Sequence, residues 1–276
     1  MTWHARLQLD YRREHARTVA RFEHSGPLRV LQSLYPEGDA VCHNVLVHPP
    51  GGLVGGDTLD IALAVGEGAH GLVTTPGASR FYRSLGPLAL QRTHAVLQAG
   101  ARLEWLPLEA LCFDACQAEN RLTMELAPGA ELIGLDVAAF GLPHAGKPFT
   151  QGQFQQHIEV PGQWLERGRV DAADALLMDG PLGLAGHRCM ASLFFVTGAP
   201  LTRERREAAL ESARAVLDTD PLAASAGATC PNDRVVVVRV LAPVVEPAMA
   251  LLQRVWAAWR IALWQLPAQR PRIWAM

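Results

Sequence analysis

Gly68-Ala69-His70-Gly71-Leu72-Val73 is the first of three similar stretches in the middle of the chain. The others, Gly100-Ala101-Arg102-Leu103-Glu104-Trp105 and Gly129-Ala130-Glu131-Leu132-Ile133-Gly134, follow at spacings of 32 and 29 residues. In each, an alternating segment ends in Gly-Ala and a second strand pattern follows. Repetition at about 30 residues is typical of units that stack and bury a face against the next unit. The stretches therefore predict stacked β layers rather than a closed barrel.

Strand patterns surround this repeat, and helical patterns come late. The leading strands are expected over 59–65, 90–97 and 122–126, and earlier strands over 18–24, 27–35 and 41–47. One helix is expected after the N-cap Thr202, and a second is expected from Pro247 to Leu263. The small residues 223–228 between them suggest a mobile loop. The sequence thus predicts one mainly β domain over 1–276, with solenoid or β-helix-like layers and two helices in its C-terminal third.

Composition limits the classes of partner. The 276 residues carry a formal net charge of −2, which gives no electrostatic footprint for nucleic acid or an anionic membrane. The five cysteines are odd in number and scattered, unlike a secreted disulfide framework. The apolar run 189–202 is too short to span a bilayer, and the first residues lack the apolar core of a signal peptide. We expect a cytoplasmic protein that binds neither nucleic acid nor membrane.

The least ordinary segment is Pro49-Pro50-Gly51-Gly52-Leu53-Val54-Gly55-Gly56-Asp57-Thr58. Its prolines fix φ, and its glycines permit conformations that a Cβ disfavours, so the segment specifies a shape. A phosphate-binding Walker loop needs Gly-Lys-Ser/Thr after the glycines, whereas Asp57-Thr58 follows here. A dinucleotide fingerprint would open a helix, but the next segment has the period of a strand. A wide turn between strands remains the alternative, with the Asp57 carboxylate at the mouth of the strand.

Patterns for tight metal binding and nucleophilic catalysis are missing from the sequence. It contains no Cys-x-x-Cys or His-Glu-x-x-His, and Cys112 and Cys116 lack the second ligand pair of a structural zinc site. Ser79 and Ser84 are not in a Gly-x-Ser-x-Gly setting. Weak, transient ligation of a divalent ion by carboxylates and water stays open.

Several motifs together resemble one known family. They are 49–57 with Leu59, 74–84, 103–107, 35–37 and 271–274. These segments are similar to those of the urease accessory protein UreD family, called UreH in some organisms, and the similarity runs nearly end to end. The resemblance implies a non-enzymatic scaffold of stacked β-strands with a few helices, in agreement with the repeat.

The resemblance also implies a role in nickel delivery. Proteins of this family bind apo-urease and the accessory protein UreF, which recruits the GTPase UreG, and an internal water-filled passage is thought to lead nickel toward urease. Nickel would then be a transported ion, with no tightly bound cofactor. Carboxylates spaced along a wet channel suit this task, because they hold Ni²⁺ weakly enough to release it.

Individual residues can be assigned by the resemblance. Asp57, Asp136 and Glu166 match acidic positions associated with the passage. The resemblance assigns Arg80, which stands where the family usually has lysine, and Tyr82 to the passage or to a partner-facing surface. The structural loop is formed by Gly51, Gly52, Gly55 and Gly56.

The chain departs from the family pattern at two places. Leu31-Gln32 replaces a usual Gln-Arg pair, and Leu142 and Lys147 replace a usual arginine and glutamate. The second change reverses a charge, so a partner surface or passage lining differs there. Two alternatives therefore remain: a diverged interaction module without metal transfer, and a nucleotide-binding enzyme that uses the Gly51–Asp57 loop.

Overall fold

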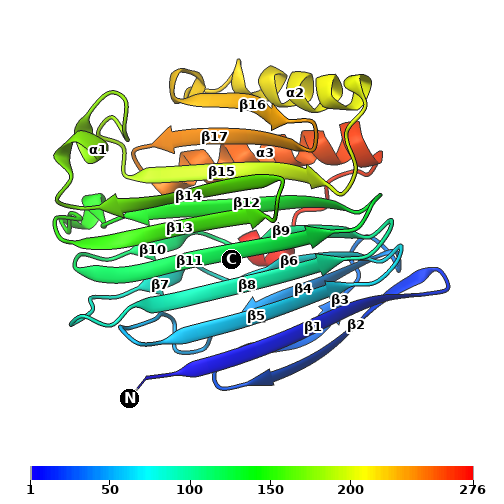
Figure 1. Ribbon diagram of the computed structural model, residues 1–276, viewed down its shortest axis with the longest axis horizontal. Coiled ribbons are helices and arrows are strands. Elements are labelled where there is room, and N and C mark those ends of the chain that lie inside the picture. Colours follow the sequence, from blue (N-terminus) through cyan, green and yellow to red (C-terminus); the bar gives the residue numbers. More distant parts are fainter. Residues whose placement is uncertain (1, 276) are drawn as a thin grey trace.

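Two β-sheets lie face to face in the computed structural model, which describes residues 2–275 (Figure 1). Seven strands form one sheet in the order β14-β13-β11-β8-β5-β1-β2. Their bounds are β1 (His4–Glu14), β2 (Arg17–Ser25), β5 (Thr58–Val65), β8 (Ala89–Leu97), β11 (Cys116–Leu126), β13 (Gly152–Val160) and β14 (Trp164–Asp171).

The other sheet has ten strands. Its main path is β16-β17-β15-β12-β9-β6-β4-β3, with β10 beside β12 and β7 beside β10. Their bounds are β3 (Arg29–Leu34), β4 (Val41–Val47), β6 (His70–Thr74), β7 (Ser79–Phe81), β9 (Arg102–Leu106), β10 (Ala110–Cys112), β12 (Glu131–Phe140), β15 (Cys189–Thr197), β16 (Ala226–Asn232) and β17 (Val235–Ala242).

The internal repeat forms the central rungs of both sheets. The leading strands β5, β8 and β11 are parallel neighbours in one sheet, and the following strands β6, β9 and β12 are parallel neighbours in the other. The antiparallel strands lie toward the ends of each sheet. The expected mainly β, solenoid-like stack is confirmed.

The Gly-Ala turns stack on one another along one edge of the molecule. Their glycines have positive φ values of 63°, 66° and 82°, at Gly68, Gly100 and Gly129. Each of the following alanines is fully buried, and their carbonyls continue the stack, because Ala69 and Ala101 accept the amides of Arg102 and Glu131 at 2.8 and 2.9 Å. Glycine relieves the strain of the left-handed turn, and alanine fits the closed corner beside it.

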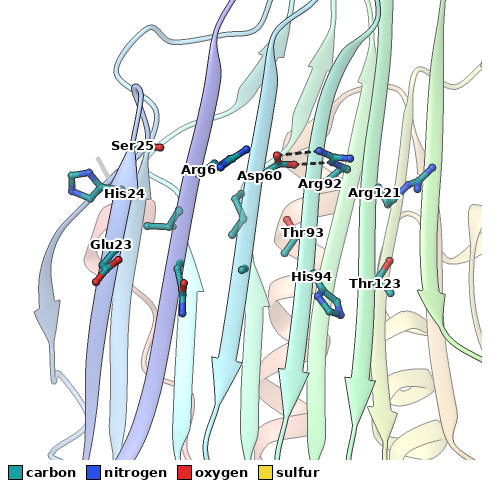
Figure 2. A pocket seen from close by; sticks show the side chains of 14 residues that line it. Arg6, Glu23, His24, Ser25, Asp60, Arg92, Thr93, His94, Arg121 and Thr123 are labelled. Atoms are coloured by element: carbon teal, nitrogen blue, oxygen red, sulfur yellow. Dashed lines mark hydrogen bonds and ion pairs between the residues drawn. The ribbon is translucent and has the colours of Figure 1, made fainter.

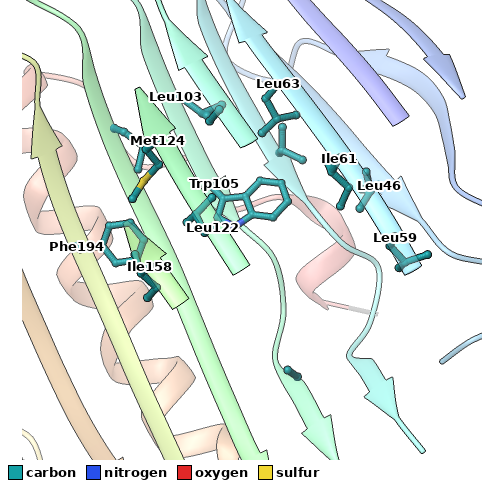
Figure 3. Close-up of a cluster of buried hydrophobic side chains, with 14 of the residues drawn as sticks. Leu46, Leu59, Ile61, Leu63, Leu103, Trp105, Leu122, Met124, Ile158 and Phe194 are labelled. Carbon is teal, nitrogen blue, oxygen red and sulfur yellow. The ribbon is translucent and has the colours of Figure 1, made fainter. Parts of the chain in front are cut away.

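Apolar side chains fill the space between the sheets. Along β5, Leu59, Ile61 and Leu63 are buried while the residues between them point outward, as the alternation predicts. Figure 3 shows Ile61 and Leu63 on the side of Trp105 from the opposite sheet, and Phe194 of that sheet beside Met124 and Ile158. A second apolar layer lies between the ten-stranded sheet and the C-terminal helices.

The two long C-terminal helices pack on the outer face of the ten-stranded sheet, whereas the short first helix contacts β14 of the seven-stranded sheet (Figure 1). Their bounds are α1 (Ala175–Asp179), α2 (Arg203–Leu217) and α3 (Val245–Trp264), with 3-10 turns η1 (Pro143–Ala145), η2 (Ala223–Ser225) and η3 (Arg272–Ala275). The two late helices are confirmed, and the Thr202 side chain caps α2 by accepting the Arg205 amide at 3.3 Å. The short helix α1 was not expected from the sequence.

The expected loop over 223–228 is wrong. Residues 223–225 form a 3-10 turn, and β16 begins at Ala226. Ala226 and Ala228 pair with Val240 and Val238 of β17. The apolar strand β17 requires hydrogen-bond partners for its backbone on both edges, and this tertiary demand outweighs the weak strand preference of small residues.

A buried ionic cluster fixes α3 to strands from the first half of the chain. Arg260 is fully buried and pairs with Glu37, with Nη2 2.5 Å from Oε2, and its Nε lies 3.8 Å from Glu104. Glu104 also accepts the indole N–H of Trp256 at 2.6 Å and lies 2.8 Å from His70 Nε2. Buried charges need such partners, so the cluster couples the position of α3 to β6 and β9.

Candidate functional site

Each glycine of the 49–58 segment occupies a position where a side chain would be strained or would clash. Gly51 and Gly56 have φ values of 75° and 94°, in the left-handed region. A Cβ added at Gly52 would lie 2.3 Å from the Tyr82 ring, and one at Gly55 would lie 2.8 Å from a backbone carbonyl. The loop is therefore packed tightly against the segment that follows β7.

Asp57 closes this loop from inside. Its carboxylate is 2% exposed, and both of its oxygens accept backbone amides: Oδ1 from Trp3 at 2.7 Å and Oδ2 from Val54 at 2.9 Å. These bonds tie the loop to the segment before β1. In this arrangement Asp57 acts as a turn residue.

Most amides of the loop are also used within the protein. They donate to carbonyls or to the Asp57 carboxylate, and they belong to Gly51, Leu53, Val54, Gly56 and Asp57. A phosphate cradle requires several free amides that point to one place. The loop geometry does not offer such a cradle.

A cavity of about 220 Å³ lies beneath the loop. Gly51, Gly52, Arg80, Gln91 and His48 are among the residues that line it. The His48 Nε2 atom is buried without a hydrogen-bond partner in the described chain. Burial lowers the pKa of His48, and the nearby Asp57 charge opposes this effect. A neutral imidazole with a free ring nitrogen is a suitable ligand for a borderline divalent ion.

A row of polar side chains leads from this cavity across the interior between the sheets. Gln91 Nε2 donates to Asn120 Oδ1 at 3.3 Å, and Asn120 Nδ2 donates to Asp136 Oδ1 at 2.8 Å. Gln156 Nε2 donates to Asp136 Oδ2 at 2.5 Å. Three amides of the seven-stranded sheet thus form a chain to one carboxylate of the ten-stranded sheet. We call Gln91, Asn120, Asp136 and Gln156 the polar seam.

The far end of the polar seam approaches the surface. Glu166 on β14 pairs with Arg239 on β17, at 2.5 Å between Oε2 and Nη2, and their side chains are 22% and 48% exposed. The negative charge of Glu166 influences Asp136. The pKa of Asp136 is raised to about 6, chiefly by burial and also by the charge of Glu166, against the opposing effect of the hydrogen bonds from Gln156 and Asn120.

The three acidic residues expected to meet nickel lie in two separate places. Asp136 and Glu166 are electrostatic neighbours, whereas Asp57 lies beside His48 at the cavity end. Nowhere in residues 2–275 do three His, Cys, Asp or Glu side chains gather in a way that could hold a metal ion. The described residues therefore bring these acidic side chains together in no chelating centre.

Arg80 and Tyr82 face different spaces. Arg80 lines the cavity under the glycine loop. The Tyr82 ring packs on Phe113, with ring centroids 4.9 Å apart, and lines a separate surface hollow of about 440 Å³ together with Lys147. Of the two, only Arg80 adjoins the polar seam.

The family departures are on the surface. Leu31 is 77% exposed, and the register of β3 against β4 shifts between Val30 and Ser33, around Leu31 and Gln32. Leu142 and Lys147 form an isolated bridge at the base of η1, and Lys147 is exposed. Neither place lines the polar seam.

The amides of the polar seam were missed by sequence reasoning. Gln91, Asn120 and Gln156 occupy core-facing positions of β8, β11 and β13, where apolar residues are the rule. The sequence feature that could have identified these amides is the presence of polar residues at core-facing positions of successive repeats. Their convergence on Asp136 depended on how the two sheets align, which the alternation does not encode.

The thiols nearest the polar seam are poor metal ligands as they stand. Cys112 and Cys116 are buried, and burial raises the pKa of Cys112 well above its ordinary value, with further contributions from Cys116 and Asp136. Metal binding requires the thiolate, which this environment disfavours.

The comparisons with known proteins concern the whole chain. A family model described as "UreD urease accessory protein" matches residues 4–275. This chain belongs to the UreD family of urease accessory proteins. Proteins named "Urease accessory protein UreD" from Paracidovorax citrulli and Polaromonas sp. JS666 are 74% and 68% identical over 276 residues, covering all of both chains. One of the same name from Leptothrix cholodnii is 55% identical, with 99% coverage of each chain.

Membership of the UreD family places the chain among the urease accessory proteins. The resemblance inferred from the sequence motifs is confirmed. None of the described helices combines the length and apolarity that crossing a bilayer requires.

Proposed function

We propose that this UreD-family chain is a non-catalytic, cytoplasmic scaffold for urease maturation, and that Ni²⁺ passes through it along the polar seam. The observation that carries this proposal is the row of hydrogen-bonded side chains from the His48 cavity through Asp136 toward Glu166. Apolar side chains fill most of the space between the sheets, and an ion is strongly disfavoured among them. The polar row is therefore the route on which a hydrated ion would meet polar groups.

The chemistry of the row suits a transported ion. Ni²⁺ binds imidazole nitrogen and carboxylate oxygen, which His48 and Asp136 supply. Because these ligands are separated along the chain of amides, each holds the ion weakly and can pass it on. Asp136, with a pKa of about 6, carries a negative charge at pH 7 in most molecules.

The partners of this function follow from the family. The chain would bind UreF, receive nickel from the GTPase UreG through UreF, and bind apo-urease as the acceptor. Nickel is the cargo, and no tightly held cofactor is required.

Replacement of one carboxylate tests the proposal. Asp136→Asn keeps the shape but removes the charge, so it should lower the nickel content and activity of urease about tenfold, as roughly 1.4 kcal/mol of added barrier would. The variant is expressed in a urease-positive host that lacks the native gene. Asp114→Asn, which changes a partly exposed carboxylate outside the polar seam, is the matched control.

Co-purification with UreF separates transport from folding. Retained UreF binding with low urease nickel supports the passage. Normal urease nickel with Asp136→Asn would refute transport through the polar seam and favour a pure interaction module, whereas loss of UreF binding would identify a structural effect.

A further inference from the structure

The open face of the seven-stranded sheet carries a transverse row of arginines. In the strand register, Arg6 on β1 lies beside Asp60 on β5, then Arg92 on β8 and Arg121 on β11. The register continues through His157 on β13 to Arg167 on β14. We call Arg6, Arg92, Arg121 and Arg167 the arginine row. Figure 2 shows the first three side chains at one level across the strands, with Asp60 between Arg6 and Arg92.

The sheet is hollowed at this row. A cavity of about 570 Å³ is lined by Arg6, Asp60, Arg92 and Arg121, together with His24 and other side chains (Figure 2). The helices α2 and α3 pack on the other sheet, so this hollow stays open in the described chain. From Arg6 to Arg167 the row crosses five strand intervals, or about 24 Å.

Charge within the row is unbalanced. Asp60 is the one carboxylate in the register of the row and is engaged by Arg92, at 2.7 and 3.0 Å, and by His4 at 2.6 Å. A second carboxylate, Glu23, lines the hollow at the end nearer β2. Arg121 pairs with Glu119 of its own strand at 2.7 Å. Arg6 and Arg167 are exposed and form no ion pair with residues 2–275. Only Arg92 and Arg121 lie on neighbouring strands, and each of them has a carboxylate partner. The surplus positive charge of the row is therefore that of Arg6 and Arg167, which anions from outside can balance.

The geometry favours carboxylates as those anions. The fork of Arg92 already holds the Asp60 carboxylate through two nitrogens. Glu119 and Glu159 stand on either side of the row, and they would repel a continuous phosphate backbone more than a few separate carboxylates. We infer that the arginine row is a docking surface for an acidic segment of a partner protein. This inference does not depend on nickel transport.

The row lies directly opposite the polar seam on the same strands. Arg92 follows Gln91 and Arg121 follows Asn120, so each strand presents an amide inward and a guanidinium outward. A partner docked there would cover the outer side of the sheet whose inner side forms the polar seam.

Binding of a defined acidic peptide tests this inference. The probe is a fluorescein-labelled peptide of alternating glutamate and serine, about 12 residues long so that it spans the row, with a glutamine-serine peptide as its uncharged counterpart. Fluorescence anisotropy with the full chain should show binding of the acidic peptide alone. Its affinity should fall as NaCl rises from about 50 to 300 mM.

Two arginine variants locate the binding. Arg6→Gln and Arg167→Gln break no ion pair within the described chain, and each should weaken binding about two- to fivefold, with the effects multiplying in the double variant. Arg12→Gln is the matched control, on the outer face of β1 and about 20 Å from Arg6. Equal melting temperatures establish that the variants fold.

Three results would overturn the inference. The first is acidic-peptide binding that neither row variant weakens. The second is an Arg12→Gln effect as large as theirs. The third is tighter binding of a single-stranded DNA of equal length that the row variants weaken, which would assign the surface to nucleic acid instead.

Discussion

At the scale of single residues, the protein uses carboxylates in two different ways. Asp57 has both oxygens committed to backbone amides and so fixes a turn. Asp136 accepts only side-chain amides in the interior, and its burial makes the charged form costly. Two residues that the sequence presents as equivalent acidic positions therefore differ in chemistry because their hydrogen-bond donors differ.

The pKa of Asp136 predicts a pH dependence of stability. The pKa of Asp136 is about 6 in the folded chain and 3.8 ordinarily, so the fold favours the protonated carboxyl. The protonated carboxyl therefore contributes to the free energy of unfolding at low pH, and this contribution is lost as pH rises from about 4 to 6. Relative to Asp136→Asn, the native chain should lose about 3 kcal/mol of unfolding free energy over that interval. Urea unfolding at a series of pH values measures the difference.

Asp114 provides a control of opposite sign. Backbone amides of Thr150 and Gln151 hold the pKa of Asp114 below its ordinary value. The native chain should therefore gain stability over Asp114→Asn as pH rises through the carboxylate range. If the stability difference between the native chain and Asp136→Asn did not change with pH, the Asp136 carboxyl would ionise as freely in the folded chain as in the unfolded chain, and the prediction would be wrong.

At the scale of elements, the Gly-Ala turn is the unit that sets the stack. Three such turns lie on one another, each with a glycine in the left-handed region. A Cβ added at Gly100 would clash with nothing, because its nearest atom would be a backbone nitrogen at 3.9 Å, an ordinary van der Waals contact. Any cost of a side chain at Gly100 therefore reports the backbone conformation alone.

Gly100→Ala should lower the unfolding free energy by about 1 kcal/mol, because alanine at positive φ is strained. Gly227→Ala in β16 is the matched control, since its surroundings are open and its φ is outside the left-handed region. That control should change stability by less than about 0.5 kcal/mol. Urea midpoints compare the two, and equal midpoints would contradict the proposed role of the turn.

Local sequence patterns predicted most of the strands and the two late helices. Alternation and the Gly-Ala repeat are local, so they identified β5, β8 and β11 and their stacking order. The strand β16 was missed because its pairing partner, and not its own composition, decides its conformation. The sequence pointed to Asp57, Asp136 and Glu166 as candidates but not to the amides of the polar seam, because these amides meet the Asp136 carboxylate across the two sheets.

At the scale of the whole molecule, the inner and outer faces of the two sheets differ in character. Their inner faces hold an apolar core interrupted by the polar seam, and α3 is fixed to the outer face of the ten-stranded sheet by buried ionic contacts. The outer face of the seven-stranded sheet stays open and carries the arginine row. This arrangement agrees with the proposed maturation scaffold, which needs a passage inside and docking surfaces outside.

Interrupting the polar seam tests the proposed passage most directly. Asn120→Leu has nearly the same size but removes the amide between Gln91 and Asp136, and Thr123→Val on the outward side of β11 is the matched control. Both variants should bind UreF normally. The measurement is nickel bound per urease active site after maturation with purified accessory proteins. We predict a fall of about tenfold with Asn120→Leu, as roughly 1.4 kcal/mol of added barrier would produce, and none with Thr123→Val, whereas full nickel occupancy with Asn120→Leu would contradict the passage.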